Sequence, residues 1–496
     1  MRMKQLLASV MLLVVLASGI TTVAAQPPYK SYTYTLRDFD APSPVPYMPV
    51  QIIDKNILGV ELKEPQDFVY DAEGNFYILT LGSTTQGSAS IVITDKNWKV
   101  TKVINTFKNN GKDDYFKKPT GLFVTQDKRI FVCDTDNKRV VVIDMDANLL
   151  QIIEKPQVEF FYSDYEFTPR KVAVGNTGSI YLVVKNDYNG IMEMDANGTF
   201  MGYIGSNRVA ANPLELFWKS IFSQKQRDQM IQYVPIEYGN IHMEKNGFMF
   251  VVSPSETVAQ PVRRLNAGGR DILIRKGYTG TVSGDRVTTN KSIFVDVTVD
   301  DWGIYSVLDQ RRGRIFSFSS EGDLLYIFGN SANQVGTFKT PVAIDTKDEK
   351  LYVLDSGNEN LSIFEMTDYA RLIKTANKAY YDGEYDLSSQ IWNQVLRINA
   401  NFELAYVQIG RVLLRKEQFK EAMEYFELGN YRGSATSRDN GYTKAMTEYR
   451  KDYLRDNFGI FASSLLAAVA LLWLLRFLKR RKTAVKTDEN WEGDSA

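Results

Sequence analysis

The sequence predicts a mainly β protein: a six-bladed β-propeller, followed by a small α-helical region and one transmembrane helix. Three observations predict this fold class. Short apolar runs of strand length, joined by turns, recur six times between residues 50 and 367. From residue 368 the apolar period becomes helical, and residues 458–475 then form a stretch without a charged side chain. Because a propeller blade needs neighbouring blades to cover its two apolar faces, the sixfold repetition favours a closed ring.

The composition excludes several kinds of site. The chain has 496 residues with 59 basic and 59 acidic side chains, so its net charge of zero gives no electrostatic footprint for nucleic acid. Its one cysteine, Cys133, excludes a disulfide within the chain and a cysteine-based zinc site. Its one histidine, His242, excludes two-histidine zinc motifs and favours a structural role for that side chain. We therefore expect neither a nucleic-acid partner nor a histidine-rich metal site.

The N-terminus resembles an export signal. Arg2 and Lys4 precede an apolar core at residues 6–20, and small residues suited to cleavage follow at positions 23–25. We expect residues 1–25 to be a signal peptide. The next segment, residues 26–49, is rich in Tyr and Pro, and its second half favours an extended tether against the ring. Whether it also contains a strand is left open.

The clearest repeat contains residues 116–146 and continues to residue 153. Four apolar runs rich in Val, Ile and Phe follow one another there: residues 121–125, 129–133, 139–143 and 149–153. Asp and Asn residues separate the runs, and their short side chains can hydrogen-bond the backbone of a turn. Four antiparallel strands of this length make one blade.

The same pattern recurs in five further places. The turn between the first and second strands of each unit falls at Gly74, Lys128, Gly178, Gly247, Gly303 and about Glu349. The sixth unit has only three strands before Thr367, and an open sheet edge invites aggregation. Residues 50–56 (VQIIDKN) resemble residues 150–156 (LQIIEKP), the fourth strand of the clearest repeat. We therefore expect this N-terminal strand to pair with residues 361–366 and close a propeller that spans residues 50–367.

An insertion separates the third and fourth units, at residues 205–233. Residues 213–231 follow a helical apolar pattern whose stripe includes Phe217 and Trp218. Two interpretations remain open for this insertion helix. It either packs on the ring as a structural element, or it forms a lid or docking element over the central channel.

One repeat resembles the NHL repeat, a propeller-forming motif. The matching residues are Pro119, Gly121, Asp134, Thr135, Asn137 and Arg139. The sixth unit keeps Pro341, Asp355 and Asn358, and the fifth keeps Asp309 but has Arg312 where Asn is expected. The resemblance covers roughly residues 51–367 and implies a six-bladed propeller. Exported proteins that combine NHL and helical repeats look like accessory components of bacterial envelope or transporter systems.

The region from residue 368 to residue 457 resembles a tetratricopeptide repeat. Ala376, Tyr385 and Trp392 recur 34 residues later as Gly410, Phe419 and Phe426, which is the period of that repeat. The resemblance implies paired helices. A stalk that spaces the propeller from its anchor and a groove that docks a protein both remain open.

A single membrane span is predicted at residues 458–478. The cluster of basic residues at its end consists of Arg476, Lys479, Arg480, Arg481 and Lys482. Basic residues mark the cytoplasmic end of a span, so we expect a cytoplasmic tail at residues 479–496. The protein would then be a single-pass protein of the cell membrane, with the propeller and the helical repeats on the extracytoplasmic side.

The sequence offers few residues for catalysis. It contains no G-x-S-x-G element, no Walker loop and no dinucleotide-binding loop. We predict no catalytic residues, no metal ligands and no cofactor. The candidate binding residues are Asp134, Asn137, Arg139, Asp309, Arg312, Asp355, Asn358, Phe217 and Trp218.

The expected function is therefore that of a membrane-anchored scaffold that is not an enzyme. Its propeller would bind a protein or glycan partner outside the cell. The alternative is a hydrolase similar to the propeller lactonases, which hold Ca²⁺ in the central channel with Asp, Glu and Asn oxygens, the ligands that this hard cation prefers.

Overall fold

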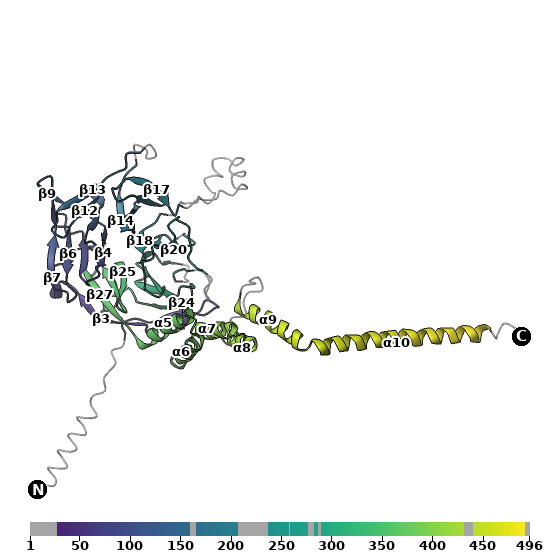
Figure 1. The fold of residues 1–496 in the computed structure, drawn as a ribbon. Helices are drawn as coiled ribbons and strands as arrows, with labels where there is room; N and C mark the ends of the chain where they lie inside the picture. Colours follow the sequence, from purple (N-terminus) through teal and green to yellow (C-terminus); the bar gives the residue numbers. More distant parts are fainter. Residues whose placement is uncertain are drawn as a thin grey trace, which may run out of the picture.

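The computed structural model describes residues 27–158, 165–206, 237–256, 258–275, 282–285, 289–430 and 440–491, with side chains as far as Arg481. The predicted signal peptide and the predicted insertion helix at 213–231 lie outside the described residues. The described strands form six blade sheets and one separate hairpin, and this confirms the predicted six-bladed propeller (Figure 1).

The blades follow one another along the chain. Blades 1 and 2 consist of β4 (Pro65–Tyr70), β5 (Phe76–Thr80), β6 (Ser90–Thr94), β7 (Val100–Ile104), β10 (Gly121–Val124), β11 (Ile130–Asp134), β12 (Arg139–Ile143) and β13 (Leu149–Ile153). Blades 3 and 4 consist of β14 (Pro169–Val174), β15 (Ile180–Val184), β16 (Ile191–Met194), β17 (Phe200–Ile204), β18 (Asn240–Met243), β19 (Met249–Val252) and β20 (Val262–Leu265). Blades 5 and 6 consist of β21 (Phe294–Val299), β22 (Tyr305–Asp309), β23 (Arg314–Phe318), β24 (Leu324–Phe328), β25 (Pro341–Lys347), β26 (Lys350–Asp355), β27 (Asn360–Met366) and β3 (Tyr47–Ile53).

The first strand of each blade lies closest to the axis. These six strands contact one another in a closed order, β4, β10, β14, β18, β21, β25 and back to β4. The second strands are covered on both faces by adjacent blades. Every residue of β5, β11, β15 and β22 is accordingly buried. Continuous apolar runs in the sequence correspond to this double coverage.

The N-terminal strand closes the ring. β3 pairs antiparallel with β27, and its register places Ile53 opposite Leu361 and Tyr47 opposite Met366. This confirms the predicted pairing of the N-terminal strand with the last blade, although the strand spans Tyr47–Ile53 rather than residues 50–56. Ile53 and Leu361 have no exposed surface, so burial of apolar side chains accompanies the backbone pairing. The two ends of the propeller are thereby joined in one sheet.

The Tyr-rich segment before this strand forms a hairpin rather than a tether alone. β1 (Tyr32–Tyr34) pairs with β2 (Asp40–Pro42) and with β24, so the hairpin widens blade 5. Tyr32 and Tyr34 both donate hydrogen bonds to the buried carboxylate of Asp285, which also pairs with Arg314. The sequence left a strand in this segment open because its partner lies almost the whole propeller away in the chain.

Three smaller elements lie between the larger ones. They are α2 (Lys55–Leu58), the hairpin of β8 (Thr106–Asn109) with β9 (Lys112–Tyr115), and the 3-10 turn η1 (Thr135–Asn137). The hairpin accounts for part of the long interval between blades 1 and 2.

Helices follow the propeller directly. They are α5 (Asp368–Tyr381), α6 (Tyr385–Ile398), α7 (Glu403–Arg415), α8 (Phe419–Leu428), α9 (Gly441–Asp456) and α10 (Phe458–Trp491). Successive helices from α5 to α9 pack against one another. Gly410 allows close helix packing, because a Cβ atom there would lie 2.8 Å from the ring of Phe426. Trp392 and Phe426 are fully buried in the core of this region.

The helical region packs on the ring. One apolar cluster contains Phe328 and Phe364 from blades 5 and 6 together with Ile373 and Trp392 from the helices. The helices contact the β21–β22 and β23–β24 turns of blade 5, where Asp300 pairs with Lys374 and Asp323 pairs with Arg411. Because adjacent strands are antiparallel, the loops after the second strands lie on the opposite face of the ring. The helices therefore occupy one face of the propeller beside blades 5 and 6 (Figure 1).

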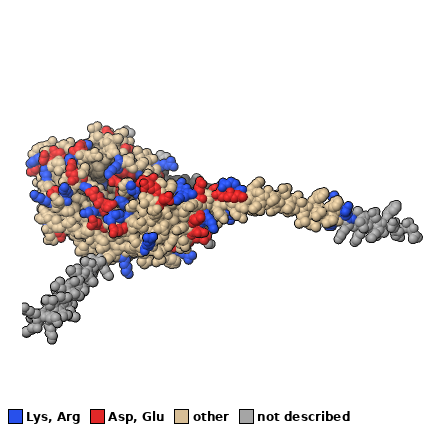
Figure 2. Space-filling model, turned by 60° about the horizontal axis from the view of Figure 1, so that its bottom comes forward, with Lys and Arg blue, Asp and Glu red and all other residues tan. Residues whose placement is uncertain are grey.

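The last helix is long and apolar. Residues 458–481 within α10 are long and apolar enough to cross a membrane, and none of this span is buried. Figure 2 shows the helix extending from a body of mixed charge, without charged side chains along most of its length. Lys and Arg side chains gather toward its far end, as the sequence predicts.

Candidate functional site

The three predicted turn aspartates have equivalent positions. Asp134, Asp309 and Asp355 each end the second strand of a blade, and each is fully buried. Their carboxylates accept backbone hydrogen bonds: Asp134 from Lys117, Asp309 from Ile293, and Asp355 from Thr340. Burial raises the pKa of Asp134 and of Asp309. These contacts fix the chain that enters each blade, so the structure gives the aspartates a role in folding.

The partner residues of this motif complete the same networks. Asn137 donates to Asp134, and Asn358 donates to Asp355. Arg139 donates to Asp134 and forms a two-bond pair with Asp114 of the β8–β9 hairpin. The hydrogen bonds from Arg139 lower the pKa of Asp114 to about 2.

Arg312 departs from the pattern. Its guanidinium Nε lies 2.6 Å from the buried carboxylate of Asp285, which belongs to the network of the N-terminal hairpin. The motif residues of blades 2, 5 and 6 therefore lie in three separate networks, and the structure does not bring them together in one site. Phe217 and Trp218 lie outside the described residues.

A polar cluster that the sequence reasoning missed lies on the ring axis. One residue of each innermost strand pairs with a buried apolar residue of the second strand, and these six axial residues are Asp67, Gly121, Lys171, Asn240, Asp296 and Ala343. All of them except Gly121 and Ala343 are polar. In blades 1, 3, 5 and 6 the position directly follows a bulge in the first strand. Alignment of the six first strands by this position could have revealed the cluster.

The polar axial residues form an ion pair and a hydrogen bond between blades. The ammonium group of Lys171 lies 2.9 Å from Asp67 Oδ2. The angles of this contact do not suit a hydrogen bond, so it is an ion pair. Asn240 donates to Asp296 Oδ1 at 2.7 Å. Gly121 lies between blades 1 and 3, and a Cβ atom there would meet the Arg170 carbonyl oxygen at 2.5 Å. The absence of a side chain at Gly121 therefore allows blades 2 and 3 to approach closely.

Two carboxyl groups of the innermost strands, Asp296 and Asp345, have raised pKa values. Burial raises the pKa of Asp296 to about 8, against the opposing effect of the Lys171 charge. Burial also raises the pKa of Asp345, which accepts a 2.7 Å hydrogen bond from Thr298 and faces the opposing charge of His242. A carboxyl group with a pKa near 8 can exchange a proton near neutral pH. Backbone and amide donors around Asp296, however, hold its two oxygens inside the ring.

The described part of the chain contains no group of three or more His, Cys, Asp or Glu side chains placed to share a metal ion. The carboxylates of Asp67, Asp296 and Asp345 come from the innermost strands of three different blades, and each already accepts a hydrogen bond from a neighbouring group. The described residues therefore do not fit the calcium site of the lactonase alternative.

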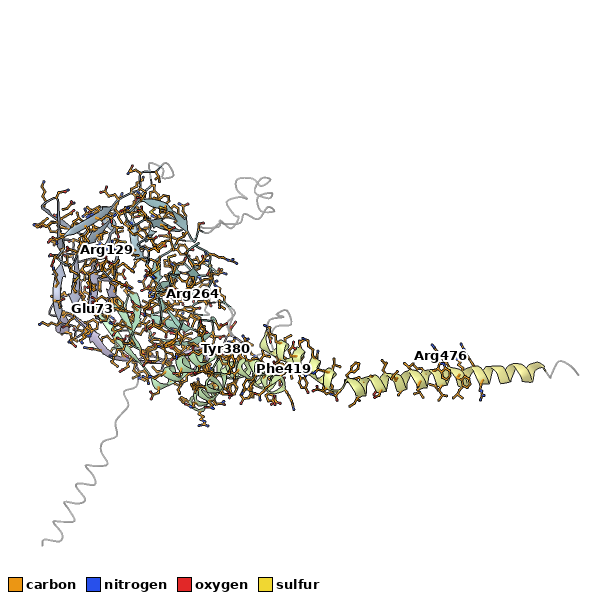
Figure 3. All side chains as sticks on the ribbon, viewed as in Figure 1. Glu73, Arg129, Arg264, Tyr380, Phe419 and Arg476 are labelled. Carbon is orange, nitrogen blue, oxygen red and sulfur yellow. The ribbon has the colours of Figure 1, made fainter. Side chains whose placement is uncertain are left out.

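A groove lies where the helices meet the propeller. It has a volume of about 180 Å³, and its walls are two turns of blade 5 with parts of α5, α6 and α7. Its lining residues are Trp302, Ile304, Ser319, Ser320, Glu321, Asn377, Tyr380, Tyr381, Tyr385, Gln408 and Arg415. Figure 3 marks Tyr380 at this junction. The groove combines four aromatic rings with amide, hydroxyl and charged groups, and concave sites with such mixed linings are typical of ligand binding.

Comparisons with known proteins give a fold likeness only. No family model matches the chain, and no curated protein matches it in sequence. The NHL and tetratricopeptide resemblances therefore stay predictions. Solved structures with similarity include a virginiamycin B lyase from Staphylococcus aureus, at 10% identity and a TM-score of 0.39, over 64% of this chain and 99% of that chain. A streptogramin B lyase structure has 12% identity and a TM-score of 0.38, over 64% of this chain and 97% of that chain.

The expectation that the chain is not an enzyme requires correction. Both of these solved structures are named as lyases, and the expected absence of catalysis does not stand. The sequence argument counted missing histidine and serine motifs. That count excludes particular mechanisms and not catalysis as such, because fold and activity are separable.

Proposed function

We propose that this chain is a membrane-anchored protein whose extracytoplasmic propeller and helical region together bind a protein or glycan partner. It would serve as an accessory component of an envelope or transporter system. The groove between blade 5 and the helices is the single observation that carries this proposal. It is concave, it lies between two structural units, and it presents several aromatic rings to solvent.

The anchor supports the proposed location. A span of suitable length and hydropathy lies at residues 458–481, and basic side chains cluster at its C-terminal end. With the resemblance of residues 1–25 to a signal peptide, this charge distribution favours a propeller outside the cell and a cytoplasmic tail. The equal numbers of basic and acidic residues give no electrostatic support for a nucleic-acid partner.

The proposal can be tested by site-specific crosslinking of the full-length chain in the membranes of the producing cell. A photoreactive phenylalanine analogue replaces Tyr381, which lines the groove with 80% of its surface exposed. The matched control replaces Tyr188, which is 42% exposed in the loop between β15 and β16. We expect a crosslinked species of higher mass from position 381 and not from position 188. Identical patterns from both positions, or no crosslink from either, would contradict binding at the groove.

A further inference from the structure

Buried polar contacts hold the groove in its observed shape. Its floor is held by the fully buried carboxylate of Asp323, which accepts hydrogen bonds from Gln408 at 2.9 Å and from Arg411 at 2.6 Å. Its wall is held by the ion pair of Lys374 with Asp300, at 3.1 Å, in which both side chains are largely buried. The groove therefore does not need to form when a ligand arrives, and a preformed site loses less entropy on binding.

Aromatic rings form the rim of the groove. Trp302, from the β21–β22 turn, is 47% exposed, and Tyr381, at the end of α5, is 80% exposed. Tyr380 and Tyr385 lie deeper, with ring centroids 5.6 Å apart and ring planes tilted by 58°. The face of an aromatic ring carries partial negative charge, and polarised C–H groups of a ligand can pack against it.

The polar groups of the groove supply both donors and acceptors. Asn377 donates its amide hydrogen to the Ile373 carbonyl and Gln408 donates to Asp323, so each amide leaves a carbonyl oxygen that can accept from a ligand. The hydroxyl groups of Ser319 and Ser320 line the same space. Such a lining suits a ligand that has several hydroxyl or amide groups on a small apolar framework.

The charges of the groove are balanced. Arg415 hydrogen-bonds Tyr380 and lies near Glu321. Lys378 pairs with Asp382 at 3.3 Å, and its ammonium group lies 4.4 Å from the centroid of the Trp302 ring. A phosphate group would need several unopposed donors, such as an arginine cluster. A ligand cation would gain little from the nearby carboxylates, because Asp382 already pairs with Lys378 and Glu321 lies near Arg415. The lining therefore favours a ligand without net charge.

We propose that this groove binds a neutral saccharide, with one sugar ring packed against the aromatic rim and its hydroxyl groups bonded to the amide and serine side chains. The inference rests on the proposed function and names the glycan, rather than a protein, as the partner. A volume of about 180 Å³ holds a single ring, and the open rim allows neighbouring sugars of an oligosaccharide to extend outward.

The test uses the full-length chain in lipid nanodiscs, because the sugar headgroups of maltoside and glucoside detergents would compete for the groove. The probes are cellotetraose, maltotetraose and N-acetylated chitotetraose, each titrated by calorimetry and by saturation-transfer NMR. We expect at least one probe to bind saturably. Tyr381→Ala and Trp302→Ala should each weaken binding by about three- to tenfold, through loss of one packed ring.

Two further variants make the result specific. Tyr381→Phe keeps the ring and should bind like the parent chain, and Tyr188→Ala removes an exposed ring far from the groove and should change nothing. Absence of saturable binding by all three probes, or equal binding by the parent, Tyr381→Ala and Trp302→Ala chains, would overturn the saccharide assignment. A protein crosslinked from position 381 together with no saccharide binding would leave the proposed function intact and reject the glycan as partner.

Discussion

Arg411 of α7 lies 2.6 Å from the carboxylate of Asp323, a side chain with no exposed surface in the β23–β24 turn of blade 5. This ion pair joins the propeller to the helical region at the floor of the groove. An ion pair in a buried position is costly to break on one side, because the remaining charge loses its partner without regaining water.

The first prediction concerns this pair. Asp323→Ala should lower the free energy of unfolding of the full-length chain by about 3–5 kcal/mol, because Arg411 and Gln408 then lose their shared acceptor. Urea unfolding in nanodiscs, followed by tryptophan fluorescence, measures the change. Glu349→Ala is the matched control, since it breaks the exposed pair of Glu349 with Arg371 and should cost no more than about 1 kcal/mol. Equal losses in the two variants would contradict a special role for Asp323.

The second prediction concerns the strand that closes the ring. Ile53→Ala should destabilise the chain by about 2–5 kcal/mol, because the side chain is fully buried beside Leu361. Val50→Ala alters the same strand at a half-exposed position and should change stability by less than about 0.5 kcal/mol. Thermal unfolding of both variants measures the two losses. Equal losses would mean that the backbone pairing alone closes the ring, without a contribution from the burial of Ile53.

The third prediction concerns the close approach of blades 2 and 3. Gly121→Ala should lower stability by about 1–3 kcal/mol, because the added methyl group would overlap the backbone of Arg170. At Gly268 the nearest atom to an added Cβ is a side-chain oxygen at 3.5 Å, so Gly268→Ala serves as the control and should be nearly neutral. An unchanged stability of the Gly121→Ala variant would show that the two strands can move apart without a loss of free energy of unfolding.

The fourth prediction concerns pH. The pKa of Asp296 is about 8 in the folded chain and about 3.9 in an unfolded one, so the folded state binds one more proton between these values. The contribution of this group to stability is therefore present at low pH and is lost as pH rises from about 4 to about 8. Asp296→Asn should remove this component and flatten the fall in unfolding free energy between pH 5 and pH 8. Parallel pH profiles of the parent and variant chains would contradict the raised pKa.

Much of the ring could be predicted from the sequence because blade strands are short, apolar and separated by turn residues. Residues 50–56 resemble the fourth strand of blade 2, and this similarity was sufficient to predict the pairing with β27. The Tyr32–Tyr34 strand was not predictable in the same way. Its partner Ile327 is distant in the chain, and three residues are too few to show a periodic pattern.

The candidate site was much less predictable than the ring. Asp134, Asp309 and Asp355 are recognisable from their spacing, but only the structure shows that each carboxylate accepts a hydrogen bond from a nearby backbone N–H group. The groove is assembled from separate segments, among them Trp302, Tyr381 and Arg415. None of these residues belongs to a motif, so their convergence depends on how the helices pack against blade 5.

The pairing of β3 with β27 also constrains how the protein is made. β3 is synthesised before the first blade, whereas its partner β27 is the last propeller strand to be synthesised. The nascent chain therefore carries this strand without its final partner while five blades emerge, and the ring cannot close before β27 has been made.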